Sequence, residues 1–531
     1  MQLVQLPNYN KWYFILLVCL TFSVFLFTSD GHRYSFDEDV IQQQALWIAT
    51  MTPHDDFILG ESRALFQYPE YFPHNTNHVC LNGILCSQTY IGSSLVEIPF
   101  IFINQAFTLI DQDTVFFTAE DFGDPHYSYW RNSINPDFTF LELVFGPTFA
   151  ALSVGVFFLV LRSYRLSFST SIIISLLFAF STTVWAYSQT SLNVVPAAFF
   201  ILLGFYFFRK FLISSSKLNL LISSITLGFG FLVRPDSILF IIPLFFYFIF
   251  ILFQRTIGYY PSKIKNLVIY FPLFVIPLFS SYGLQKFVDL IRFGAGNTLE
   301  YVGVINIINP AHHGVTIGTF GMLFAPGVGL FIFAPILLTC FFSFPHFFQK
   351  HKGECILFIA ILSCFILFYS QSHAWHGLNA WGERYLFAAM PFLLIPLGFS
   401  LEKFSSKRFT ILLICLGSLG VFFNISYLVT DVSWFIWGLM GSGKGLYELG
   451  HIETILWVHP LTLWTFEFSQ LTHTIKYLFY SLEMSLHPDI YLLKVLGPNL
   501  YLIFFILPTS ILVYFIIRLS RIADSTQTLK H

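Results

Sequence analysis

Charged residues are scarce in this chain. Asp, Glu, Lys and Arg make up only 11% of its 531 residues, whereas soluble domains carry roughly 25%. Hydrophobic residues reach 56%, and Phe alone occurs 68 times. A single soluble core cannot bury so much apolar surface, so the composition excludes an ordinary soluble protein and predicts an all-α integral membrane protein.

The chain also lacks the motifs of nucleotide-binding and zinc enzymes. "GLMGSGKG" at 438–445 approaches a phosphate-binding P-loop, but Gly445 stands where that motif has Ser or Thr and no strand precedes it. We interpret it as a loop. The His312–His313 pair and the His373/His376 pair lack the helical HExxH spacing of zinc enzymes, which favours structural roles and leaves a metal role open. No Rossmann fingerprint and no internal repeat are visible.

Cysteines are few and form no disulfide framework. Two of the seven, Cys80 and Cys86, lie six residues apart in a polar segment, where a local disulfide and two free thiols are equally acceptable if the compartment is oxidising. A zinc pair is disfavoured because their spacing is wide. The others lie in or beside apolar runs and are expected to be packed thiols: Cys19, Cys340, Cys355, Cys364 and Cys415.

Long apolar runs are what the chain has in abundance. About twelve of them have the length needed to cross a bilayer. They lie near 12–29, 139–161, 168–187, 192–208, 218–233, 237–254, 267–285, 325–347, 355–370, 385–401, 409–428 and 499–517.

The charges between these runs predict the orientation. With a cytoplasmic N-terminus, the inner loops hold 17 of the 27 Lys and Arg but only 3 of the 29 acids. This bias satisfies the positive-inside rule and places both termini in the cytoplasm of a multi-pass cell-membrane protein. The first run is expected to be a retained anchor, because no small-residue cleavage site follows it.

Three outer segments are long in this topology, namely 30–138, 286–324 and 429–498. Residues 90–110 are interrupted by Glu97 and Pro99 and are predicted to form an interfacial amphipathic helix rather than a further span. Two Trp-rich stretches of the last outer segment, "WFIWGLM" and "ILWVHPLTLWTFEF", suit the membrane interface as well.

Two charged motifs stand directly beside predicted spans. "YSFDEDV" places Asp37, Glu38 and Asp39 shortly after the first span. A solvated turn with Asp39 at a helix start would explain them, but a carboxylate there could also act as a general base or hold a divalent cation. Arg234-Pro235-Asp236 is equally consistent with a turn closed by a local ion pair and with a cation that binds a lipid phosphate.

The order of these motifs resembles the GT-C superfamily of membrane glycosyltransferases, which includes the protein O-mannosyltransferases and the lipid A aminoarabinose transferases. "YSFDEDV" stands where that family has its acidic motif. "YIGSSLVEIPFIFI" is similar to its juxtamembrane helix, "LGFGFLVRPDSILFIIPL" to its span–Arg-Pro–span turn, and "HAWHGLNAWGERYLFAAM" to its Trp-Gly-x-Arg-Tyr element. "LIRFGAGNTLEYVG" and "GMLFAPGVGLFIFAPILL" look like its middle outer loop. The likeness covers a module over 1–428, and residues 429–531 would add interfacial helices, a final span and a cytoplasmic tail.

This resemblance implies transfer of a sugar from a polyprenyl-phosphate carrier to a lipid, glycan or protein acceptor on the outer face, with inversion. Asp37 would be the general base, with Glu38 beside it. Arg384, Arg234 and Arg292 would bind the carrier phosphate, and His373, Trp375 and His376 would line the sugar site. No nucleotide is required, and a divalent cation remains open.

One departure from the family pattern keeps other function classes open. The outer turn between the third and fourth spans, where relatives often carry an Arg and an acid, contains Gln189 and Asn193 and no charge. A non-catalytic assembly protein is therefore an alternative. A transporter or lipid flippase is another, although those proteins typically show ionisable groups within spans and repeated halves.

Overall fold

The structure is a computed structural model that describes residues 9–31, 36–50, 89–107, 139–255, 260–293, 314–372, 375–377, 380–403, 406–430, 460–483 and 490–528. Over these residues the chain is helical and contains no strand, as expected for an all-α membrane protein.

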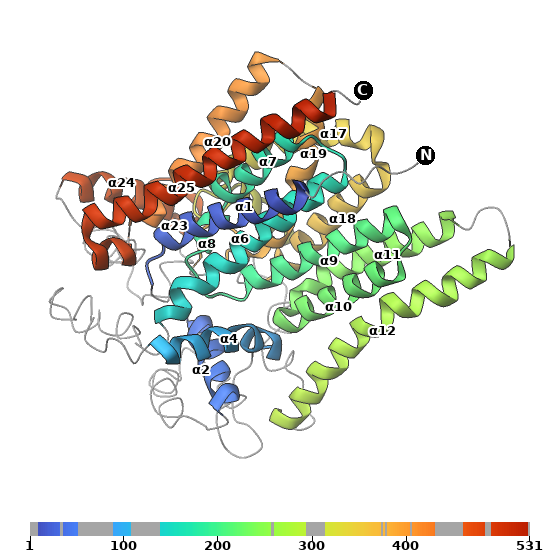
Figure 1. Cartoon of the computed structure of the whole chain (residues 1–531). Coiled ribbons are helices and arrows are strands. Elements are labelled where there is room, and N and C mark those ends of the chain that lie inside the picture. The colour runs from blue at the N-terminus through green and yellow to red at the C-terminus, as the bar shows by residue number, and fades with distance from the viewer. Residues whose placement is uncertain are drawn as a thin grey trace.

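The N-terminal half of the chain consists of helices and one 3-10 turn (Figure 1). They are α1 (Tyr9–Phe27), α2 (Phe36–Thr50), α4 (Ile91–Phe107), α6 (Thr139–Ser163), α7 (Phe168–Ser181), α8 (Val184–Tyr187), α9 (Val194–Ser214), α10 (Lys217–Val233), the 3-10 turn η5 (Pro235–Ser237), α11 (Ile238–Arg255) and α12 (Tyr260–Phe293). Helices α2 and α4 lie together at one end of the bundle, here termed the loop end.

The C-terminal half surrounds this core with shorter pieces and two long helices. They are α15 (Gly314–Phe324), α16 (Leu330–Phe333), η6 (Pro335–Thr339), α17 (Cys340–Lys350), α18 (Lys352–Tyr369), η7 (Arg384–Ala389), α19 (Met390–Lys403), α20 (Lys407–Leu428), α23 (Pro460–Trp464), α24 (Gln470–Glu483) and α25 (Tyr491–Thr528). The last helix, α25, is kinked at Gly497, where the backbone is not helical, and lies beside α1 (Figure 1).

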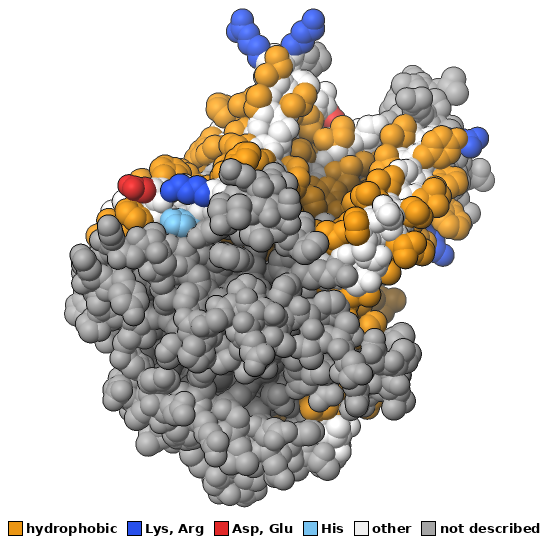
Figure 2. Space-filling view, turned by 90° about the vertical axis from the view of Figure 1, so that its left-hand side faces the viewer, with side chains coloured by type: hydrophobic (Ala, Val, Ile, Leu, Met, Phe, Trp, Pro, Cys, Tyr) orange, Lys and Arg blue, Asp and Glu red, His pale blue; other side chains and the backbone are white. Residues whose placement is uncertain are grey.

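Nine helices in the described part of the chain are long and apolar enough to cross a membrane. Helices α7 and α10 occupy two more of the twelve predicted runs as shorter apolar helices. Large apolar side chains face outward along many of them, as Figure 2 shows for one face. An apolar outer surface of this extent requires lipid around it.

The run predicted over 325–347 does not form one helix. Pro326 follows α15, and Pro335 separates α16 from the helical turn η6. Proline lacks the N–H that a continuous helix needs and clashes with the preceding turn, so this run is divided into α16, η6 and α17.

Aromatic rings fill the centre of the bundle. Phe205 of α9 meets Phe240, Phe358 and Phe392 at centroid distances of 6.4, 5.8 and 5.0 Å. Such tilted and edge-on contacts add to the burial of the rings themselves. Three helices besides α9 are thereby joined in one core.

A buried ion pair joins two helices at the opposite end of the bundle. Arg209, near the end of α9, binds Glu354 in the first turn of α18, and both side chains are almost fully buried. His351 Nδ1 lies 3.0 Å from the other Glu354 oxygen. The Arg209 guanidinium also covers the Tyr164 ring at 3.9 Å, which provides a second contact for the buried cation.

Helix α4 forms where the sequence predicts an interfacial helix, over Ile91–Phe107. Its buried side carries Ser93, Ser94, Glu97 and Asn104, whereas Phe102 and Ile103 are exposed. The polar side chains of α4 therefore face the protein together with Val96 and Ile101, and its position at the membrane interface stays a prediction.

Candidate functional site

The acidic motif lies at the start of helix α2, which packs against the bundle at the loop end. Phe36 is its first residue, so Asp37 and Asp39 lie in its first turn; the side chains of both are outside the described residues. The Glu38 side chain is fully buried, and its Oε1 accepts a hydrogen bond of 2.9 Å from the backbone N–H of Ser191. Glu38 is thus directed toward the turn between α8 and α9.

One helical turn later, Gln42 binds the same place. Its side-chain amide donates to the Glu142 carboxylate of α6 and to the Ser191 hydroxyl, the latter at 2.9 Å. Positions 38 and 42 share one face of a helix, so this face of α2 attaches to α6 and to the α8–α9 turn. The pattern "EDVIQ" is what allows the attachment.

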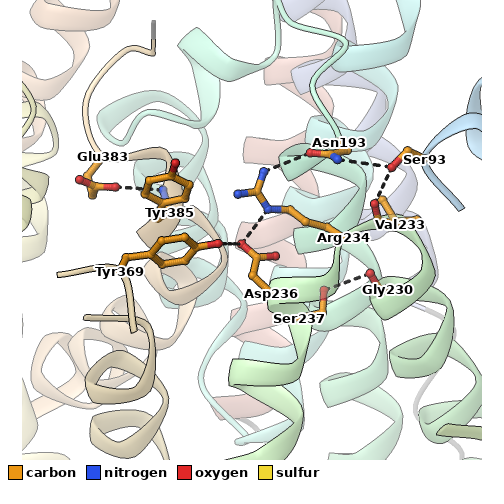
Figure 3. A network of polar contacts seen from close by, with 10 residues as sticks. All are labelled: Ser93, Asn193, Gly230, Val233, Arg234, Asp236, Ser237, Tyr369, Glu383 and Tyr385. Carbon is orange, nitrogen blue, oxygen red and sulfur yellow. Dashed lines mark hydrogen bonds and ion pairs between the residues drawn. The ribbon is translucent and has the colours of Figure 1, made fainter. Parts of the chain in front are cut away.

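A second group of polar residues forms around Arg234, at the break between α10 and η5 (Figure 3). Arg234 Nε donates to Asp236 Oδ2 at 2.7 Å, which confirms the local ion pair predicted for Arg-Pro-Asp. Tyr369, at the end of α18, donates its hydroxyl proton to the same Asp236 oxygen at 2.6 Å. The Arg234 and Asp236 side chains are only 14% and 11% exposed, so the pair is fixed in orientation.

Two guanidinium groups lie near one tyrosine ring. Tyr385 stacks on Tyr369 with ring centroids 3.8 Å apart and an angle of 10°. The Arg234 and Arg384 guanidinium carbons lie 5.8 and 5.4 Å from the Tyr385 centroid. Arg384 and Tyr385 belong to the "WGERY" element, so the structure brings Arg234 and Arg384 together although 150 residues separate them in the chain.

The uncharged turn that departs from the family pattern connects the contacts of α2 with the polar residues around Arg234. Asn193 accepts a hydrogen bond from Arg234 Nη1 at 3.1 Å and donates one to the Ser93 hydroxyl at 3.3 Å. Ser93 belongs to α4 and donates in turn to the Val233 carbonyl at 2.5 Å. Asn193 therefore orients the Arg234 side chain and links it to α4, a role that does not require a charged residue.

Burial raises the pKa of Glu383 well above its usual range, although the Tyr385 N–H and the Arg384 cation act in the opposite direction. The Glu383 carboxyl accepts that N–H at 3.1 Å, which starts η7. Its charge is therefore easily neutralised. The two arginines then exceed the one carboxylate paired with them, Asp236, which leaves a net positive charge among these four residues.

A fully buried hydroxyl lies beside the arginines. Tyr187 of α8 packs edge-on against Phe387 at 5.1 Å, and Arg384, Glu383 and Arg234 are all close enough to act on its hydroxyl electrostatically. That hydroxyl has no hydrogen-bonding partner within the described part of the chain. A buried group of this kind can donate to a ligand without losing a protein contact.

The other predicted site residues are placed only in part. Trp375 and His376 are both buried, and Trp375 packs against Trp464 at 5.7 Å. Gly377, next in the chain, lies against Arg384, since a Cβ there would be 3.1 Å from Arg384 Cγ. This turn therefore adjoins the arginine pair.

Several predictions fall outside the described residues. They concern His373, the His312–His313 pair, Cys80, Cys86, the P-loop-like stretch, "WFIWGLM" and the side chain of Arg292. Among the residues that are described, no three His, Cys, Asp or Glu side chains come together as a metal site. Because the Asp37 side chain is not among them, the divalent cation stays a prediction.

Sequence reasoning missed the contacts that hold Asp236 and helix α2 in place. Tyr369 meets Asp236 across 133 positions, and Gln42 meets Ser191 across 149. Neither pair shows a regular spacing in the sequence from which the contact could be predicted. The tyrosine of "WGERY" was visible, but only the fold reveals that it is the ring beside both guanidinium groups.

The model of the dolichyl-phosphate-mannose-protein mannosyltransferase family matches residues 123–291, about a third of the chain. The matched part contains Tyr187, Asn193 and Arg234, but not Asp37 or Arg384. Comparisons with curated proteins and with solved structures found no match. The family match confirms the resemblance to GT-C membrane glycosyltransferases and supports a polyprenyl-phosphate-linked sugar as donor.

Proposed function

We propose that the chain is an inverting glycosyltransferase that moves a sugar from a polyprenyl-phosphate carrier to an acceptor hydroxyl at the loop end of the bundle. The observation that carries this proposal is the pair of guanidinium groups beside Tyr385, one from the family-matched part of the chain and one from "WGERY".

The arginine pair has the chemistry of a phosphate site. Arg234 uses Nε and Nη1 within the protein, so its Nη2 can bind a phosphate oxygen. Guanidinium and phosphate form strong charge-assisted hydrogen bonds. Two such groups would lower the free energy of the phosphate as negative charge develops on it, which is the main electrostatic task in this transfer. The Tyr187 hydroxyl could donate a further hydrogen bond.

The reaction would be a single displacement. Asp37 accepts the proton of the acceptor hydroxyl, the acceptor oxygen attacks the anomeric carbon, and the bond from that carbon to the phosphate oxygen breaks. Polyprenyl phosphate leaves with the bonding electrons. The attack occurs opposite to the leaving group, so the configuration at the anomeric carbon inverts. Glu38 would fix the start of α2, and thereby Asp37, against the Ser191 turn.

The donor can be identified from what accumulates without this protein. Cells lacking the chain should accumulate one lipid-linked sugar, whose intact mass gives the sugar and the prenyl length. The purified protein should then convert that compound to polyprenyl phosphate and a product of inverted configuration. Retained configuration, or no conversion of any accumulated lipid-linked sugar, would refute the proposal.

The phosphate site has a separate test. Arg384→Ala should weaken binding of the carrier, whereas Arg408→Ala, at the predicted cytoplasmic side, should not. Unchanged carrier binding in Arg384→Ala would remove Arg384 from this role.

A further inference from the structure

The chain at and just after the end of α1 is held by three distant groups. Carbonyls at and beyond a helix end have no partner within that helix, and beside a membrane an unsatisfied carbonyl is costly. Here the Phe27 carbonyl accepts from the Tyr501 hydroxyl at 2.6 Å, the Thr28 carbonyl from Gln189 Nε2 at 2.6 Å, and the Ser29 carbonyl from the Tyr491 N–H at 2.9 Å. These contacts fix residues 27–29, which precede the acidic motif in the chain.

Two of the three donors belong to α25. Its Tyr501 and Phe505 rings also contact the Phe27 ring at 5.7 and 5.5 Å. Gly31 has φ +76°, and a Cβ there would be 2.9 Å from the Tyr491 ring. The backbone turn at Gly31 and the close approach of Tyr491 therefore both require glycine. Residues 27–31 are therefore shaped against the start of α25.

Helix α2 is thus held from two sides. Glu38 and Gln42 fix its first turns to the α8–α9 turn, and the same turn supplies Gln189 for the Thr28 carbonyl. Helix α25 supplies the other contacts upstream. A catalytic group displaced by about 1 Å can lose on the order of a hundredfold in rate, so both attachments bear on the acidic motif.

Helix α25 contributes little to the packed core. The window of α25 that could cross a membrane is 11% buried, compared with 78% for that of α6. It also lies outside residues 123–291, which the family model matches. Helix α25 therefore lies at the periphery of the bundle. Its contacts with residues 27–31 matter more than its contribution to core stability.

We infer that α25 is part of the catalytic unit and that Tyr501 is a positioning residue, which holds the Phe27–Gly31 segment and through it the acidic helix α2. This inference rests on the proposed function, because Asp37 is the group whose position would matter.

The test compares two tyrosines of α25. Tyr501→Phe removes one hydroxyl and keeps the ring, and the matched control is Tyr514→Phe, whose side chain is 56% exposed. Hydrogen exchange of residues 27–50 should become faster in Tyr501→Phe but not in the control. The kcat for sugar transfer should fall roughly tenfold with KM changed less than about twofold, at a melting temperature close to that of the control. Gly31→Ala should accelerate exchange over residues 27–50 and lower kcat more strongly, and it should also lower the melting temperature because of the strain at this position.

Two results would overturn the inference. One is unchanged exchange over residues 27–50 in both Tyr501→Phe and Gly31→Ala. The other is faster exchange with an unaltered kcat. If the wild-type protein transfers no sugar, the proposed function fails, whereas the exchange measurement still decides whether α25 positions α2.

Discussion

Arg234 offers the sharpest way to separate ligand binding from folding. It pairs with Asp236, and Tyr369 holds the same carboxylate. Replacing Arg234 alone by Gln would leave the buried Asp236 carboxylate without its cation. Removing one partner of a buried pair costs about 3–5 kcal/mol of folding free energy. The companion variant Asp236→Asn removes the stranded charge, so the double variant should regain most of this stability.

Carrier binding should respond differently. A hydrogen bond to a charged group contributes about 1.5–3 kcal/mol, which is about a 10-fold to 100-fold change in affinity. We expect this loss in Arg234→Gln and in the double variant alike, because both lack the guanidinium. Asp236→Asn alone keeps the cation, still held by Asn193, and should bind the carrier within about threefold of wild type.

The assay is titration of the three variants with polyprenyl phosphate in lipid nanodiscs, together with thermal unfolding. The reasoning is refuted if the double variant regains both stability and carrier affinity, because Arg234 would then serve the fold alone. It is equally refuted if Arg234→Gln unfolds at the wild-type temperature, because the ion pair would then not be buried in the way that the structure describes.

Three further predictions concern stability and the approach of α4. Burial raises the pKa of Glu383, so above the ordinary carboxyl pKa of 4.5 the unfolded chain releases a proton that the folded chain retains. The melting temperature of the wild type should therefore fall, relative to that of Glu383→Gln, as the pH rises above 4.5. Parallel pH profiles of the two melting temperatures would contradict this. Arg209→Met should destabilise the protein by about 3–5 kcal/mol in chemical unfolding, and adding Glu354→Leu should restore much of it; an additive loss in the double variant would show that the pair is not coupled. Gly92→Ala should lower both the melting temperature and carrier affinity, since a Cβ there would lie 2.4 Å from the Leu232 backbone, whereas Gly283→Ala, with nothing within 4 Å, should change neither.

The sequence was sufficient to predict the membrane class and most helices. Both follow from the length and composition of each apolar run and require no contact between distant residues. The helix over 91–107 was also predicted. Its polar residues recur at helical spacing and form one face, which the structure buries. The Arg234–Asp236 pair was predictable because the two residues are neighbours in one turn.

The site itself could not be assembled in this way. Tyr369, Tyr385 and Asn193 acquire their roles only when three separate helix ends meet around Arg234. The broken region over 325–347 shows a different difficulty. Its composition is apolar enough for a span, and the prolines that divide it act through backbone geometry, which hydropathy does not measure.

The central claim is that Asp37 deprotonates the acceptor, and its most direct test is the transfer rate of Asp37→Asn compared with Asp39→Asn. Both variants lose one acid from the first turn of α2, so their effects on helix stability should be similar. With carrier binding measured in parallel, Asp37→Asn should lower kcat by about 10²–10⁴-fold at unchanged carrier affinity, while Asp39→Asn should retain most of the wild-type rate. Transfer by Asp37→Asn at the wild-type rate would contradict the account.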